Sequence, residues 1–215
     1  PSGSPLSLSN TDCKLFAMAI KAAAESTIAA WAYAVQRGFL PGRQMLANIA
    51  EIEARAIQLC MHHQQACMIF FDFAAAFPSL CHRYLMEALK LLVRWLRILG
   101  GVFESVLVGA GVRQGCPLSA LLFVAAVDPF LRAMRRAMDP TSIHRAFADD
   151  VGLVLTSLWR EGPAIANAFT QFETVSALGL GHAKCILIPI WDYDASDLAA
   201  RLAMLMPAWA SFEIR

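Results

Sequence analysis

The chain has 215 residues, of which 58% are hydrophobic and 16% are charged, and its formal net charge is +1. Disordered chains combine low hydrophobicity with high net charge, so this composition excludes intrinsic disorder. The near-neutral charge by itself indicates no polyionic partner. A membrane-spanning helix is also excluded, because residues 118–127 end at Asp128 and residues 68–77 contain Asp72, whereas a span needs about 20 apolar residues.

The first residues and the cysteines bear on the compartment. The chain begins Pro1-Ser2-Gly3-Ser4, without methionine, a basic segment or an apolar segment, so we expect no export signal and interpret the chain as a fragment. Six scattered cysteines without a Cys-x-x-Cys pair are typical of a reducing compartment. We therefore expect an intracellular protein.

Hydrophobic periodicity and the positions of Gly and Pro predict the secondary structure. In chain order we predict helices over residues 10–35 and 44–63, a buried strand over 67–73, helices over 78–99 and 117–138, a hairpin of strands 144–148 and 151–156, a helix over 163–178, a strand over 184–190 and a helix over 196–206. Few strands among many helices favour an α+β fold whose sheet is covered by helices on one side.

Three aspartates interrupt apolar segments. Asp72 lies within the buried strand, and Asp149 and Asp150 lie at the tip of the apolar hairpin. A buried carboxylate costs several kcal/mol unless it is paired or binds a metal. Because neither apolar run contains Lys or Arg, a cation from elsewhere must offset these charges.

Two explanations of the aspartates compete. In the first, Asp149 and Asp150 form a solvated turn, since Asp is a favoured turn residue, but this accounts poorly for Asp72. In the second, the strand and the hairpin lie side by side, and three carboxylates hold two Mg²⁺ ions, with Mn²⁺ as a substitute. Two such ions promote in-line phosphoryl displacement, which both nucleases and polymerases carry out.

Six motifs in order resemble the reverse transcriptases of non-LTR retrotransposons. They are PLSLSNTDCKL (5–15) and QRGFLPGR (36–43) for two fingers motifs, FDFAAAF (71–77) for motif A, GVRQGCPLS (111–119) for motif B, FADD (147–150) for motif C and GLGHAK (179–184) for motif D. An isolated Asp-Asp pair is a weak signal. The motif B string is specific, and the ordered set of six is more specific still.

The resemblance implies an α+β right-hand polymerase fold. This fold has a palm, with a four-stranded antiparallel sheet packed on helices, and partial fingers; we expect the thumb to be absent, because the chain ends about where it would begin. The implied boundaries are residues 1–66 for the fingers, 67–80 for the palm with motif A, 81–113 for a helix connecting fingers and palm, and 114–215 for the palm with motifs B, C and D.

The resemblance also implies the catalytic residues. Asp72 and Asp149 would be the metal ligands, and Asp150 would be a supporting carboxylate at the same metal site, because adjacent strand residues point to opposite faces. Lys184 would donate a proton to the departing pyrophosphate, or alternatively would be an exposed cation.

Further residues are implied to bind the nucleotide. Phe77, five residues after Asp72, would be the steric gate against a ribose 2′-hydroxyl, or alternatively a core aromatic. Gln114 would contact the incoming nucleotide and the template base, and Gly115 would let the backbone approach closely. Arg43 and Lys14 would contact phosphates, or alternatively be solvated charges. Ser4 departs from the family pattern, which has Arg at this position.

We therefore predict an RNA-directed DNA polymerase. Its partners would be an RNA template, a DNA primer and deoxynucleoside triphosphates, with no membrane, and the family implies a nuclear site of action. One alternative is an inactive retroelement remnant, or an RNA-binding module that keeps the palm fold. Another is a two-metal nuclease, which would not need the Gln-Gly pair of motif B.

Overall fold

The computed structural model describes residues 11–96, 111–112 and 115–215. The helices are α1 (Thr11–Trp31), α2 (Met45–Cys60), α3 (Ala76–Ser79), α4 (His82–Leu96), α5 (Ser119–Arg136), α6 (Leu158–Ser176) and α7 (Ala195–Leu205), with short 3₁₀ turns η1 (His182–Lys184) and η2 (Pro207–Trp209). The strands are β1 (Cys67–Phe71), β2 (Ile143–Phe147), β3 (Asp150–Leu155), β4 (Ile186–Pro189) and β5 (Glu213–Ile214). The predicted α+β class is confirmed.

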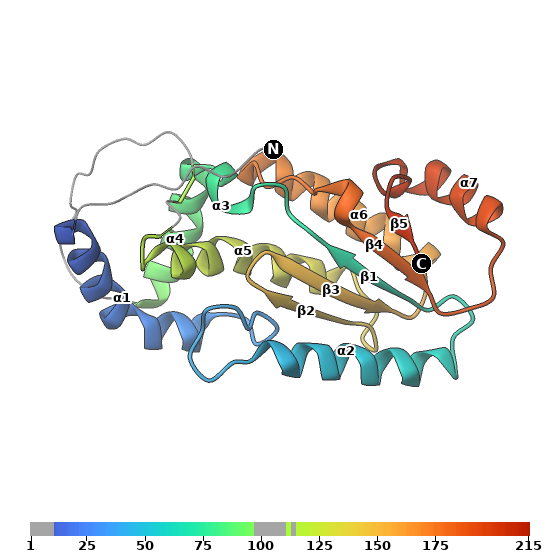
Figure 1. Cartoon of the computed structure of the whole chain (residues 1–215), viewed down its shortest axis with the longest axis horizontal. Helices are drawn as coiled ribbons and strands as arrows, with labels where there is room; N and C mark the ends of the chain where they lie inside the picture. The colour runs from blue at the N-terminus through green and yellow to red at the C-terminus, as the bar shows by residue number, and fades with distance from the viewer. Residues whose placement is uncertain (1–10, 97–110, 113–114) are drawn as a thin grey trace.

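The strands form one sheet in the order β2-β3-β1-β4-β5 (Figure 1). The first four strands in this order pair with one another antiparallel, as predicted, and β2 and β3 form the predicted hairpin. The sheet has a fifth strand that we did not predict, the two-residue β5, which runs parallel to β4. A two-residue strand has no periodic sequence signal, and its pairing depends on the fold that places it beside β4.

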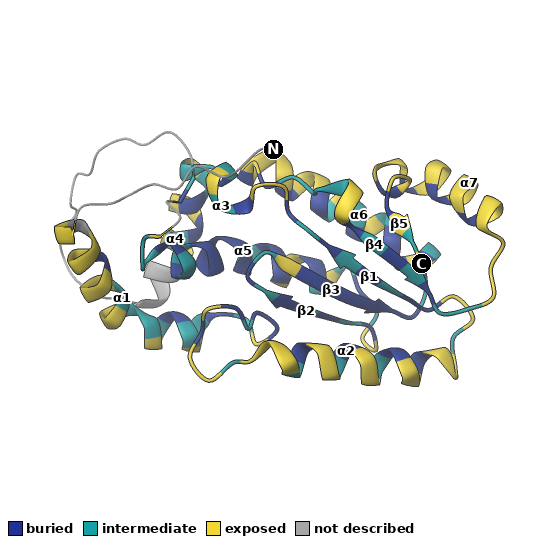
Figure 2. Ribbon diagram, in the orientation of Figure 1, coloured by how far each residue is buried: buried dark blue, intermediate teal, exposed yellow. Residues whose placement is uncertain are grey.

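The sheet is covered by helices on both faces, so the prediction of one covered face is wrong. Side chains of β1 alternate between the faces. Ile69 and Phe71 lie in the main core with side chains of α5 and α6, whereas Met68 and Phe70 pack against a second cluster that includes Ile52 of α2. Figure 2 shows the buried sheet and the exposed outer surface of α2. Each fully buried large apolar side chain contributes roughly 1.5–3 kcal/mol.

The cover on the α2 face is incomplete. A cavity of about 670 Å³ lies between α2 and the sheet, and most of the side chains that line it are apolar. Arg145 and Asp150 are among the polar residues of its lining. The acidic end of the hairpin therefore borders this cavity.

No helix in the described ranges has the length and hydropathy needed to cross a bilayer.

Several boundaries differ from the predicted ones. The helix predicted over 78–99 is two helices, because Leu80 has an extended backbone (ψ 119°) and the Cys81 N–H bonds to the carbonyl of Ser176. The predicted strand 184–190 begins at Ile186, because Lys184 belongs to the 3₁₀ turn η1. Helix α6 starts at Leu158, five residues before its predicted start at Pro163.

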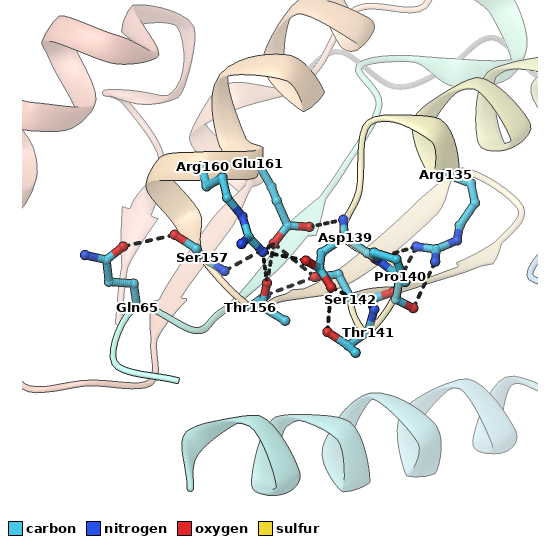
Figure 3. A network of polar contacts seen from close by, with 10 residues as sticks. All are labelled: Gln65, Arg135, Asp139, Pro140, Thr141, Ser142, Thr156, Ser157, Arg160 and Glu161. Atoms are coloured by element: carbon cyan, nitrogen blue, oxygen red, sulfur yellow. Dashed lines mark hydrogen bonds and ion pairs between the residues drawn. The ribbon is translucent and has the colours of Figure 1, made fainter. Parts of the chain in front are cut away.

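The early start of α6 follows from a buried acidic network. The Glu161 carboxylate accepts hydrogen bonds from Thr156 Oγ1 at 2.7 Å, Ser142 Oγ at 3.1 Å and the Asp139 N–H at 2.7 Å (Figure 3). It also accepts one from the N–H of Ser157, which precedes the helix. These bonds satisfy a buried charge, and they hold the end of the β2–β3 hairpin that is remote from Asp149 against α6.

Candidate active site

The fold brings the three predicted aspartates to the ends of two paired strands. Asp72 directly follows β1, Asp149 lies in the two-residue turn between β2 and β3, and Asp150 is the first residue of β3. Phe71, the last residue of β1, pairs with Val151, so Asp72 follows β1 at the end of the sheet where β3 begins with Asp150.

The charges of these aspartates act on one another. Burial raises the pKa of Asp149 above its ordinary value, and the nearby charge of Asp72 raises it further. Burial likewise raises the pKa of Asp150, with added repulsion from Asp149 and Asp72. Each shift means that the ionised form is disfavoured in the protein alone. The three carboxylates therefore form one electrostatic unit that a cation would stabilise.

Lys184 is the cation next to this unit. Its Nζ lies 3.3 Å from Oδ2 of Asp72, although its side chain is 75% exposed. The N–H of Gly181 donates to the backbone carbonyl of Asp72 at 2.8 Å. A Cβ on Gly181 would lie 2.9 Å from Oδ2 of Asp72, so only glycine fits without displacing the carboxylate. The GLGHAK segment thus lies against Asp72.

Aromatic rings surround Phe77. Its ring is half-buried and stacks on Phe123 of α5 at a centroid distance of 4.7 Å. Phe39 meets Phe77 edge to face at 6.3 Å and also lies 6.3 Å from Phe147. The predicted gate residue Phe77 is therefore packed against Phe123 on one side. On the other side Phe39 connects it to Phe147, the last residue before the turn. The sequence interpretation did not single out Phe39, which is 46% exposed and has a φ of 58°.

Motif B begins beside Phe77. The Val112 N–H donates to the carbonyl of Phe77 at 2.8 Å, and Gly111 packs so tightly on Pro78 that a Cβ there would lie 2.5 Å from the Pro78 carbonyl oxygen. Gly115 has a φ of 86°, which suits its predicted role in a close backbone approach. Gln114 and Ser4 lie outside the described residues.

The two predicted phosphate-binding cations lie elsewhere. The Arg43 guanidinium donates to the backbone carbonyls of Ala29, Ala32, Tyr33 and Gln36 at 2.6–3.1 Å. Four of its five N–H donors are thus engaged, and burial lowers its pKa. The Arg43 guanidinium thus caps the end of α1 through backbone carbonyls, and its contact with phosphate stays a prediction.

Lys14 is exposed in the first turn of α1. That end of α1 lies at the far left of Figure 1, away from the sheet. The structure therefore does not bring Lys14 to the acidic cluster.

The residues present suit the divalent ions that the family uses. Among the described residues, no three His, Cys, Asp or Glu side chains converge as a ready-made metal cage. Mg²⁺ does not need one, because it commonly binds one or two carboxylates and takes its other ligands from water and substrate phosphates. Asp72 Oδ2 is buried and accepts no hydrogen bond within the described part of the chain. An enclosed acceptor of this kind, beside two carboxylates with raised pKa, matches the chemistry of a hard-cation site.

This sheet, with acidic residues at the ends of its central strands and helices packed behind it, defines a palm-type polymerase core. The chain belongs to the reverse transcriptase (RNA-dependent DNA polymerase) family, whose sequence profile matches residues 4–190. The resemblance drawn from the motifs is thereby confirmed.

Two individual proteins are similar to the chain. The chain is 30% identical to the transposon TX1 uncharacterized 149 kDa protein of Xenopus laevis; the match covers 72% of this chain and 14% of that protein. It is also similar to a solved telomerase from Candida albicans in complex with the TWJ fragment of telomeric RNA. That likeness has a TM-score of 0.54 and 11% identity over 82% of this chain and 33% of the telomerase chain, and it supports the palm fold.

Proposed function

We propose that the chain forms the polymerase core of a non-LTR retroelement reverse transcriptase, which extends a DNA primer on an RNA template. The observation that carries this proposal is the meeting of Asp72 with Asp149 and Asp150 at one end of the sheet, within a chain of the reverse transcriptase family. Within this proposal, residues 1–66 act as fingers, 67–80 and 114–215 as palm, and 81–113 as the connection.

The proposed reaction is nucleotidyl transfer. The 3′-hydroxyl oxygen of the primer attacks the α-phosphorus of a bound deoxynucleoside triphosphate, the bond from that phosphorus to the leaving oxygen breaks, and pyrophosphate departs. The hydroxyl proton passes to solvent. Lys184, which is exposed beside Asp72, donates a proton to the leaving pyrophosphate.

The aspartates would supply the negative charge that such a site needs. Asp72 and Asp149 would hold two Mg²⁺ ions, or Mn²⁺ in their place, with Asp150 in support, and the ions would supply positive charge at the attacking oxygen and the triphosphate. The raised pKa values of Asp149 and Asp150 favour this proposal, because a bound cation would offset both the burial and the repulsion that raise them.

The neighbouring residues would select the nucleotide. Phe77 presents a ring that α5 supports from behind, and a rigid ring can exclude a 2′-hydroxyl by contact. Gly115, with its positive φ, would allow the motif B backbone to approach the base pair. Gln114 would contact the incoming nucleotide, as the family resemblance implies.

Primer extension tests the proposal. The purified protein is given an RNA template, a labelled DNA primer, deoxynucleotides and Mg²⁺, and it is compared with Asp149→Asn and with Asp192→Asn as an exposed control. We expect extension by the parent and the control, and a loss of roughly 100- to 1000-fold in Asp149→Asn, the scale on which single electrostatic groups act in catalysis. No extension by the parent, or undiminished extension by Asp149→Asn, would contradict the proposal.

A further inference from the structure

The side chain of Gln36 holds the backbone on both sides of Ala148, the residue before Asp149. Gln36 is fully buried. Its Nε2 donates to the Ala148 carbonyl at 3.0 Å, and its Oε1 accepts from the Ala148 N–H at 2.9 Å. One amide thus binds both peptide groups that flank the Ala148 Cα, and so it fixes the direction in which the chain enters Asp149.

The turn needs this support because it is strained. Ala148 has a φ of 58°, in the left-handed region. An L-residue in that region loses roughly 1–2 kcal/mol relative to the right-handed one. The two hydrogen bonds to Gln36 offset this loss, since the buried side-chain amide and the buried backbone groups of Ala148 satisfy each other's hydrogen-bonding capacity.

The loop that carries Gln36 is also shaped to reach the turn. Gly38 N–H donates to Gln36 Oε1 at 2.8 Å, so the loop itself orients the amide. A Cβ on Gly38 would lie 2.1 Å from the backbone nitrogen of Ala148. Only glycine allows this approach, and the segment 36–38 therefore presses directly on the acidic turn.

We propose that Gln36 is a positioning residue for Asp149, acting through Ala148 and without touching substrate. The proposal rests on the proposed function, in which Asp149 holds a divalent ion. It assigns a purpose to the QRGFLPGR segment beyond its place in the fingers: this segment fixes the carboxylate on which metal binding depends. The amide is needed as a combined donor and acceptor, which Met does not supply and Glu supplies only when it is protonated.

The matched control is Asn48 of α2. Asn48 is also a buried amide, and its Nδ2 donates at 2.9 Å to the carbonyl of Ala146, which lies in β2 two residues before Ala148 of the turn. Asn48→Leu therefore removes a side-chain hydrogen bond to the same hairpin but leaves the hydrogen bonds of the turn in place. Gln36→Met removes both the donor to Ala148 and the acceptor. Gln36→Glu removes the donor when its carboxyl is ionised and keeps the acceptor in case the Met variant does not fold.

Three readouts separate positioning from stability. The first is Mn²⁺ affinity, measured from the electron paramagnetic resonance signal of the free ion. The second is hydrogen exchange of the Ala148 amide, measured by NMR. The third is kcat and KM for deoxynucleotide, measured by primer extension. We expect Gln36→Met to weaken Mn²⁺ binding and kcat by roughly 10–100-fold, the range seen when a metal ligand loses its support. Ala148 amide exchange should accelerate, and Asn48→Leu should leave all three unchanged.

The outcomes also separate this proposal from the proposed function. Unchanged Mn²⁺ affinity in both Gln36 variants, or an equal loss in Asn48→Leu, would overturn the positioning role. If the parent binds Mn²⁺ but extends no primer, the proposed function fails, while a loss of Mn²⁺ affinity in Gln36→Met would still establish the positioning role.

Discussion

Lys184 Nζ lies 3.3 Å from Oδ2 of Asp72, an oxygen that is itself buried and accepts no hydrogen bond from the described residues. The contact joins a freely accessible ammonium to an enclosed carboxylate oxygen. An ion pair with one partner this exposed contributes at most about 1 kcal/mol to stability. Its arrangement is better suited to chemistry, because a cation that reaches solvent can also reach a substrate phosphate.

We predict that Lys184→Gln slows catalysis without unfolding the protein. If Lys184 protonates pyrophosphate, single-nucleotide incorporation should slow by roughly 100-fold or more, the usual range for general acid catalysis. The melting temperature should change by only a few degrees, because the ion pair is exposed. Rapid-quench kinetics and thermal unfolding measure the two effects.

Lys90 provides the control for this prediction. It forms a comparably exposed ion pair with Glu87 at 2.6 Å on α4. Lys90→Gln removes the same charge and the same kind of contact away from Asp72. Equal incorporation rates in Lys184→Gln and Lys90→Gln would show that Lys184 is only an exposed cation.

The contacts of Arg43 predict that its substitution lowers stability, whereas a phosphate-binding role would predict a raised KM for deoxynucleotide. Lys keeps the charge but cannot present four donors in the planar fork with which Arg43 binds four carbonyls. We expect Arg43→Lys to lower the free energy of unfolding by about 2–4 kcal/mol, because several carbonyls lose their donors. Urea unfolding measures this loss, and KM for deoxynucleotide should not change.

Arg136 is an exposed residue of α5, so Arg136→Lys serves as the control. A stable Arg43→Lys protein with a raised KM would instead favour the phosphate role.

The sequence predicted the elements whose signal is local. Apolar runs located β1 and the hairpin, and the aspartates within them identified the acidic cluster. The cover provided by α2 was not predictable, because Met68 and Phe70 belong to a continuous apolar run that does not tell which face is covered. The role of Gln36 has no local signal either: its partner Ala148 is 112 residues away in the chain.

Arg43 shows the limit of prediction from residue type. An arginine beside Pro41 and Gly42 has the same sequence context whether it meets phosphate or backbone. Its partners, among them the carbonyls of Ala29 and Ala32, become available only because α1 ends at Trp31 and the following loop returns past it. Charge patterns identify a cation, and tertiary structure decides its partner.

Phe77→Val should relax the selection against ribonucleotides. The ring stacks on Phe123, so it is held in place, and its removal leaves room next to the acidic turn. We expect the incorporation ratio of dTTP to UTP to fall roughly tenfold or more, since a contact that rejects a hydroxyl is lost. The measurement is competitive incorporation opposite a template adenine.

Phe123→Leu is the control for this effect. It removes the supporting ring and leaves Phe77 present, and both variants should lose stability, by about 1–3 kcal/mol for the cavity created. An unchanged dTTP-to-UTP ratio in Phe77→Val would leave Phe77 as a core aromatic only.

His144 should make the protein less stable in mild acid. Its side chain is 1% exposed, and its Nε2 has no hydrogen-bond partner in the described part of the chain. Burial, with smaller contributions from the charges of Arg145 and Arg135, lowers the pKa of His144 from 6.5 to about 4. The unfolded chain therefore binds a proton between pH 6.5 and 4 that the folded protein does not, so stability falls as the pH falls through this window.

From pH 7 to pH 5 the loss in the free energy of unfolding should be about 2 kcal/mol. Urea unfolding at the two pH values measures it. His144→Leu should remove this part of the dependence, whereas the exposed His62→Leu should keep it. The same loss in His144→Leu as in the parent would show that another group titrates.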